Sequence, residues 1–116
     1  DGKVVPEIIL DDQSLVIQTE RGIVIILGCA HSGIINVINH AIKMTEVDTI
    51  FGIIGGTHLG FSGDVQLQKT IQALKAYRIE HFVPCHCTGI AAAVRLSREF
   101  KKIFHFPHVG MGFEFS

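Results

Sequence analysis

The chain has 116 residues, of which 47% are hydrophobic and 18% charged, and its formal net charge is -1. A near-neutral chain without a basic stretch does not suit a nucleic-acid-binding protein or a protein of anionic membrane surfaces. Its apolar runs are much shorter than the roughly 20 residues of a membrane-spanning helix. We therefore expect a single domain over residues 1–116, with no nucleic-acid or membrane partner.

The cysteines and the start of the chain indicate where such a domain works. The three cysteines are an odd number, and two of them are separated by one residue, which argues against a disulfide framework. No secretory pattern is present, so we expect a reducing cytoplasmic location. Because the chain begins with Asp1 and is more apolar than a small solvated domain requires, we also expect upstream sequence and a buried contact with another domain or a second copy.

The first part of the chain predicts three strands, at Val4–Leu10, Leu15–Thr19 and Ile23–Leu27. The connections between them are too short for crossovers, so the three strands should form an antiparallel meander. Ile23–Leu27 is apolar throughout, which is typical of a central strand buried on both faces.

From residue 32 on, helical and strand patterns alternate. Helices are expected after Ser32, Asp64 and Thr88, each of which can act as an N-cap, and the last helix should end near Phe100. The remaining predicted strands are Asp48–Ile54, Glu80–Val83, Ile103–Phe106 and Phe113–Phe115. The predicted order is βββ-αβ-αβ-α-ββ, a mixed α/β (α+β) domain.

Three histidines occupy the same place in this pattern. His31, His58 and His86 each follow a strand-like run. Parallel strands would bring all three to one edge of the sheet, where ligands bind in α/β proteins. Imidazole is the commonest metal ligand, and three protein ligands with an open water position describe a catalytic zinc site. A single histidine here would be read as structural, but three equivalent ones favour metal binding.

The other histidines and the cysteines are expected to be structural. These histidines are His40, His81, His105 and His108. Cys85 and Cys87 flank His86, but a Cys-His-Cys zinc site is disfavoured because neighbouring residues of an extended strand point apart. We therefore expect free, partly buried thiols at both positions and at Cys29.

Three hydroxyl residues are candidate substrate contacts. Ser32 and Thr88 follow His31 and His86 and open predicted helices, whose free N–H groups attract anions. Thr57 precedes His58 and is grouped with them. The expected substrate is a small molecule, and a phosphorylated compound is one candidate.

The sequences around the histidines resemble the later motifs of the metallo-β-lactamase superfamily. They are GCAHSGIIN (28–36), GGTHL (55–59) and PCHCTG (84–89), and the similarity extends from about Leu15 to Phe115. The branch they resemble is that of metal-dependent hydrolases related to the dihydropterin ribofuranosyl-aminobenzene phosphate synthases. The resemblance implies half of an αββα sandwich with a binuclear metal centre. It also implies that His31 and His86 bind the first and second metal, whereas His58 stands where most members have a bridging aspartate.

The first motif of that superfamily, His-x-His-x-Asp-His, is absent, and no histidine precedes His31. We therefore expect the C-terminal portion of a metal-dependent hydrolase that is inactive alone and that pairs with the missing N-terminal half or with itself. Zinc is the expected metal, with iron or manganese as alternatives, although manganese prefers oxygen ligands.

Two other functions stay open from the sequence. The first is a non-catalytic oligomerisation or interaction module with a vestigial or structural metal site. The second is a flavodoxin-like or nucleotide-binding domain, which ranks lower because the chain has neither a Gly-x-Gly-x-x-Gly sequence nor a P-loop.

Overall fold

The structure is a computed structural model that describes residues 13–108, 110 and 112. Its strands are β1 (Ser14–Thr19), β2 (Gly22–Leu27), β3 (Thr49–Gly56), β4 (Arg78–Ile79) and β5 (Phe82–Cys85). Its α-helices are α1 (Ile34–Thr45), α2 (Asp64–Leu74) and α3 (Ile90–Glu99), and two 3-10 turns are η1 (Leu59–Phe61) and η2 (His86–Thr88). The predicted mixed α/β fold is confirmed.

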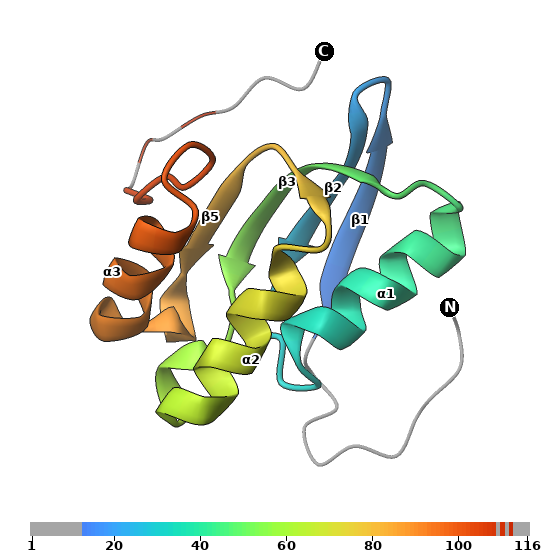
Figure 1. The fold of residues 1–116 in the computed structure, drawn as a ribbon. Coiled ribbons are helices and arrows are strands. Elements are labelled where there is room, and N and C mark those ends of the chain that lie inside the picture. The colour runs from blue at the N-terminus through green and yellow to red at the C-terminus, as the bar shows by residue number, and fades with distance from the viewer. Residues whose placement is uncertain (1–12, 109, 111, 113–116) are drawn as a thin grey trace.

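One sheet contains all five strands. β1 and β2 are antiparallel, as predicted, and β2, β3 and β5 are parallel neighbours in that order. The short β4 pairs with the start of β3. In Figure 1 the arrowheads of β2, β3 and β5 point to the same edge of the sheet. Two predicted strands, Val4–Leu10 and Phe113–Phe115, lie outside the described residues.

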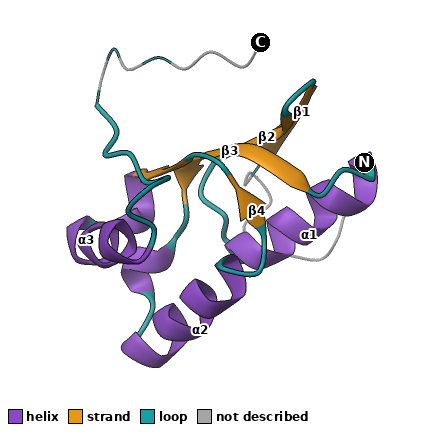
Figure 2. Ribbon diagram, turned by 45° about the horizontal axis from the view of Figure 1, so that its top comes forward, coloured by secondary structure: helices purple, strands orange, loops and turns teal. Residues whose placement is uncertain are grey.

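The three α-helices cover one face of this sheet. The connections from β2 to β3 and from β3 to β5 step across the sheet in the same direction. Since such crossovers are right-handed, their helices lie on the same side, as Figure 2 shows. The core fills the space between them, with fully buried side chains such as Ile25, Ile53, Ile38, Ile71 and Leu96. No helix of the described ranges is long and apolar enough to cross a membrane.

The opposite face of the sheet is not covered by these helices (Figure 2). On β1, Leu15 is 63% exposed and Ile17 is 39% exposed, opposite Ile26 and Val24 of β2. An apolar strand face in water is what one expects of a sheet whose second layer is contributed by another segment. The predicted contact of this face with another domain or copy stays a prediction.

Two predicted strands differ from those observed. The strand predicted over Glu80–Val83 is divided into β4 and β5, and β5 runs on to Cys85. The division is local, because Glu80 donates its N–H to Ile50 and His81 accepts one from Ile53, so the ladder with β3 continues. In place of a strand at Ile103–Phe106 there is a single bridge between Phe82 and Phe104.

Each predicted helix cap differs from the observed one by one residue: Ser32 and Thr88 were predicted one residue too early, and Asp64 one residue too late. The N-caps of α1, α2 and α3 are Gly33, Gly63 and Gly89, and none of the three is capped by a side chain. Gly33 and Gly89 have φ angles of 98° and 77°, a region that residues with a Cβ rarely adopt. The chain therefore turns at glycine before each of these helices, and the preceding hydroxyl residues are left for other contacts.

Candidate metal centre

The histidines His31, His58 and His86 all follow the carboxyl ends of parallel strands. His31 lies in the turn after β2, His58 comes two residues after β3, and His86 is the first residue of η2, directly after β5. Because β2, β3 and β5 are adjacent and parallel, their three loops meet at one edge of the sheet. The structure thus brings the three loops together; the role of the histidines as ligands stays a prediction.

His31 and His58 form a close pair. Their ring centroids are 4.7 Å apart, with the rings nearly perpendicular at 85°. The Nδ1 atom of His58 is buried and has no hydrogen-bond partner among the described residues. Buried polar atoms are nearly always satisfied, so such a nitrogen indicates a missing water or ion. The sulfur of Cys29 completes this group, whose three ligand atoms all lie within 4.8 Å of one another.

His86 belongs to a second group. Its ligand atom and the sulfurs of Cys87 and Cys29 also lie within 4.8 Å of one another. The structure therefore divides the predicted histidine triad into a pair and a single residue, connected through Cys29. Imidazole nitrogen and cysteine sulfur are the donors that zinc prefers, and iron accepts them as well. The residues of both groups fit such a metal.

The backbone is in an unusual conformation at the same three loops. Ala30, His58 and His86 have φ angles of 58°, 59° and 55°, in the left-handed region. This region costs a residue with a side chain about 1–3 kcal/mol and is concentrated at functional sites. Apart from Glu46, which caps α1, these are the non-glycine residues with positive φ in the described part of the chain.

As predicted, the three cysteines are partly buried thiols outside any disulfide. The argument against a Cys-His-Cys site does not hold, because Cys87 lies within the 3-10 turn η2 and not in an extended strand, and its sulfur is 3.2 Å from that of Cys29. The Cys87 sulfur also accepts the backbone N–H of His58 at 3.0 Å. Cys85 stays apart from both groups, and burial raises the pKa of its thiol. No local spacing reveals the contact between Cys29 and Cys87, which depends on the order of the strands.

Two threonines connect the loops of His58 and His86. Thr57 and Thr88 are buried, and their hydroxyl oxygens are 2.7 Å apart. Thr88 also contacts the carbonyl oxygen of Cys85 as a donor at 2.9 Å, and Leu59 donates its N–H to the Thr57 hydroxyl at 3.3 Å. These contacts fix one loop against the other. A substrate contact at either threonine stays a prediction.

Two cavities open beside the histidines. One, of about 310 Å³, is lined by His31, His58, the exposed Ser32 and Gln66 of α2, among others. The other, of about 370 Å³, lies at His86 and is bounded by apolar residues of the η2–α3 region and by Phe106 and Pro107. Ser32 thus lies in the lining of a cavity beside the histidine pair. Its contact with a substrate stays a prediction.

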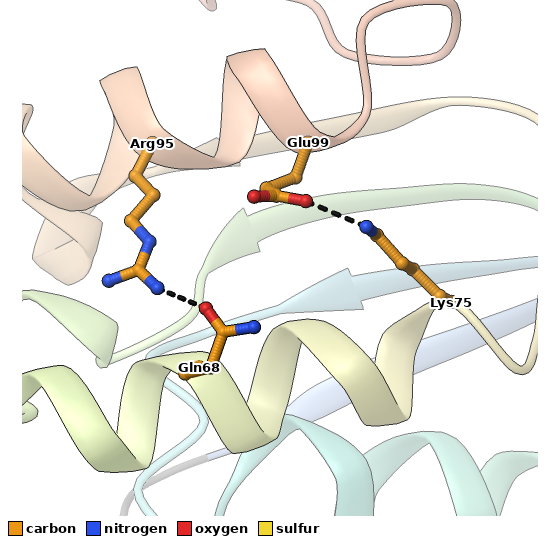
Figure 3. A network of polar contacts seen from close by, with 4 residues as sticks. All are labelled: Gln68, Lys75, Arg95 and Glu99. Atoms are coloured by element: carbon orange, nitrogen blue, oxygen red, sulfur yellow. Dashed lines mark hydrogen bonds and ion pairs between the residues drawn. The ribbon is translucent and has the colours of Figure 1, made fainter.

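The helices behind the site are joined at their surface. Lys75 at the end of α2 donates to Glu99 of α3 at 2.7 Å, and Arg95 donates to Gln68 (Figure 3). The hydrogen bond and the charge of Lys75 hold the pKa of the Glu99 carboxyl below its usual range. Exposed pairs of this kind contribute little to stability, so they connect α2 and α3 at the surface while the buried core holds the two helices in place.

This fold, with histidines at the ends of successive parallel strands, is that of part of a metallo-β-lactamase superfamily protein. In three dimensions the chain is similar to Tm1679, described as a metal-dependent hydrolase of the β-lactamase superfamily. The TM-score is 0.84 and the sequence identity 33%, over 98% of this chain and 44% of that one.

Two proteins of Methanocaldococcus jannaschii are similar in sequence over 95% of the chain. One is a 7,8-dihydropterin-6-methyl-4-(beta-D-ribofuranosyl)-aminobenzene-5'-phosphate synthase, 34% identical over 110 residues that make up 37% of its length. The other is the uncharacterized protein MJ0448, 37% identical over 39% of its length. No protein-family model matches the chain. The resemblance predicted from the sequence is confirmed, and the chain spans about two fifths of the length of these relatives.

Proposed function

We propose that the chain is the C-terminal portion of a metal-dependent hydrolase, in which His31, His58 and His86 bind divalent metal. The observation that carries this proposal is the His31–His58 pair, 4.7 Å between centroids, at the carboxyl edge of parallel strands. The description of Tm1679 as a metal-dependent hydrolase supports it. The imidazole nitrogens of these histidines suit zinc, with iron as the alternative.

The chemistry follows from the donors and the cavity. A divalent metal supplies Lewis acidity and lowers the pKa of water to about 7. The residues of this chain would hold the metal and position its ligands. The histidines bind the metal, and the Thr57–Thr88 contact keeps the loops of His58 and His86 in register. Ser32 and Gln66 give the cavity polar groups for a small ester or phosphoester substrate.

Catalysis is proposed to need a second polypeptide segment. The chain has no His-x-His-x-Asp-His sequence, and it matches about two fifths of its relatives. We expect the chain alone to bind metal but to show little or no turnover. Addition of a polypeptide that carries the missing motif should produce hydrolysis, and a folded mixture without turnover would contradict this part of the proposal.

Metal binding tests the central claim. Zinc content and affinity are measured for the wild type and for a variant with His31, His58 and His86 replaced by alanine. The matched control is His40→Ala, which removes an exposed imidazole of α1. We expect bound zinc in the wild type and the control and its loss in the triple variant. Equal affinity in all three proteins would show that the histidines are not ligands.

The exposed face of β1 favours one alternative, an oligomerisation module with a structural metal. Leu15 and Ile17 are 63% and 39% exposed on a face without helices. Under this alternative the chain is a stable dimer whose stability survives chelation and the loss of the three histidines. Its mass in solution, measured with and without chelator for the wild type and the triple histidine variant, separates the two functions, since only the alternative predicts a dimer that survives both losses.

A further inference from the structure

Cys29 is the residue that the two metal-binding groups share. Its sulfur lies within 4.8 Å of the ligand atoms of His31 and His58, and equally of those of His86 and Cys87. We infer that Cys29 is a metal ligand whose thiolate lies between two metal positions, and that Cys87 is a second thiolate ligand beside His86. This inference rests on the proposed function, which provides the histidine ligands but neither sulfur.

The fold brings these two sulfurs together across a strand. Cys29 follows β2 and Cys87 follows β5, and β3 lies between those strands. The sulfurs meet above the end of β3 because Gly56 has no side chain there. A Cβ on Gly56 would lie 3.0 Å from the Cys87 sulfur and 3.2 Å from the Cys29 Cα. The glycine therefore leaves the space in which the two thiols, 3.2 Å apart, are held.

The distances suit metal binding with small movements. In a tetrahedral zinc site with Zn–S bonds of about 2.3 Å and Zn–N bonds of about 2.0–2.1 Å, ligand atoms lie roughly 3.4–3.8 Å apart. The atoms of each group are within 4.8 Å of one another before any ion is bound. A shift of about 1 Å, within the reach of side-chain rotation, would close either group on a metal ion.

A thiolate is suited to the shared position. The imidazole nitrogen has one lone pair and binds one metal, whereas a thiolate sulfur has several and can serve two. The second sulfur is also supported, since the backbone N–H of His58 donates to Cys87 Sγ at 3.0 Å. Hydrogen bonds of this kind orient metal ligands and are often as important as the ligands themselves.

Cobalt binding to the reduced chain tests this assignment without an activity assay. Co²⁺ bound by thiolate gives a sulfur-to-metal charge-transfer band in the near ultraviolet, which imidazole ligands alone do not give. We expect two Co²⁺ ions per chain, with this band. Cys29→Ser should weaken the binding of both ions at least tenfold, and Cys87→Ser should weaken the binding of one. The matched control Cys85→Ser should leave the affinity for both ions unchanged, because Cys85 is outside both groups.

Alkylation of the wild type gives a second readout that does not depend on the folding of any variant. Zn²⁺ should slow the reaction of iodoacetamide with Cys29 and Cys87, mapped by mass spectrometry, and leave the rate at Cys85 unchanged. Cobalt bound through the histidines without a charge-transfer band, or without protection of Cys29, would overturn the inference and leave the proposed function standing. Cobalt retained by the triple histidine variant would refute the proposed function. Failure of the wild type to bind either ion would overturn the inference and also the metal binding expected under the proposed function, since all the donors lie in this chain.

Discussion

Gly56→Ala is the substitution by a single methyl group that we expect to disturb the metal centre most. A Cβ at Gly56 would lie 2.6 Å from the carbonyl oxygen of Gly28, in addition to its contacts with Cys87 and Cys29. The nearest atom belongs to the backbone and cannot rotate away, so β2, β3 or the loop between them must shift. Overpacking of this kind costs about 1–3 kcal/mol. For a domain of this size we expect Gly56→Ala to lower Tm by roughly 4 °C for each kcal/mol.

Gly52→Ala is the matched control, because it adds the same methyl group to the same buried strand. The Cβ at Gly52 would meet its nearest atom, the carbonyl oxygen of His81, at 3.9 Å, which is an ordinary contact. Its φ angle is not in the positive region, so the substitution should gain about 0.4–1 kcal/mol from the reduced freedom of the unfolded chain. Gly56 has no positive φ either, so the same gain applies to both variants and cancels in their difference. Urea unfolding of the metal-free variants measures that difference, expected at roughly 1–3 kcal/mol from the overpacking at Gly56. Equal stability of the two variants would refute the steric reasoning, and unchanged cobalt binding by Gly56→Ala would refute its consequence for the thiols.

Three further predictions concern the surroundings of the site. Thr88→Val should destabilise the fold by about 1–3 kcal/mol in urea unfolding, because the buried Thr57 hydroxyl loses the oxygen to which it donates, whereas Thr88→Ser should retain most of the stability. Glu99→Gln should lower stability slightly at neutral pH by removing the ion pair with Lys75. Because that pair lowers the pKa of Glu99, the difference from the wild type should vanish as pH falls through and below the ordinary Glu value of about 4.3; a difference that persists in acid would contradict the charge argument. Since burial raises the pKa of Cys85, its alkylation at pH 8 should be slower in the folded chain than in urea, and equal rates would contradict this.

The fold could be predicted from the sequence because its signals are local. The apolar run Ile23–Leu27 is the buried strand β2, and the helical pattern ending near Phe100 is α3. The errors lie where backbone geometry overrides side-chain preference. Ser32 and Thr88 are good caps by residue type, yet the helices begin at Gly33 and Gly89, whose positive φ angles carry the turn. Capping rules assume that the chain enters the helix through an extended residue, whereas these two loops enter it through a glycine with a positive φ angle.

The candidate site was predictable only in its outline. The repeated order of strand and histidine placed His31, His58 and His86 at one edge, because parallel strands end together. The division into two groups could not be predicted, since it depends on which loops lie next to each other. A zinc site with Cys85 and Cys87 was disfavoured from the geometry of an extended strand, but the chain after β5 turns into a 3-10 conformation, which brings Cys87 to Cys29.

The end of β3 explains why so many donors gather in so small a volume. β3 is the central strand, and its last two residues are Gly55 and Gly56, so no side chain stands between the loops on either side. A Cβ on Gly55 would lie 2.1 Å from the carbonyl oxygen of Leu27, which shows how closely β2 approaches this end. The loops that carry His31 and His86 can therefore fold over β3 and meet at its terminus, where His58 emerges. The placement of the ligands is thus a consequence of backbone packing in the described part of the chain, and it should persist in the metal-free protein.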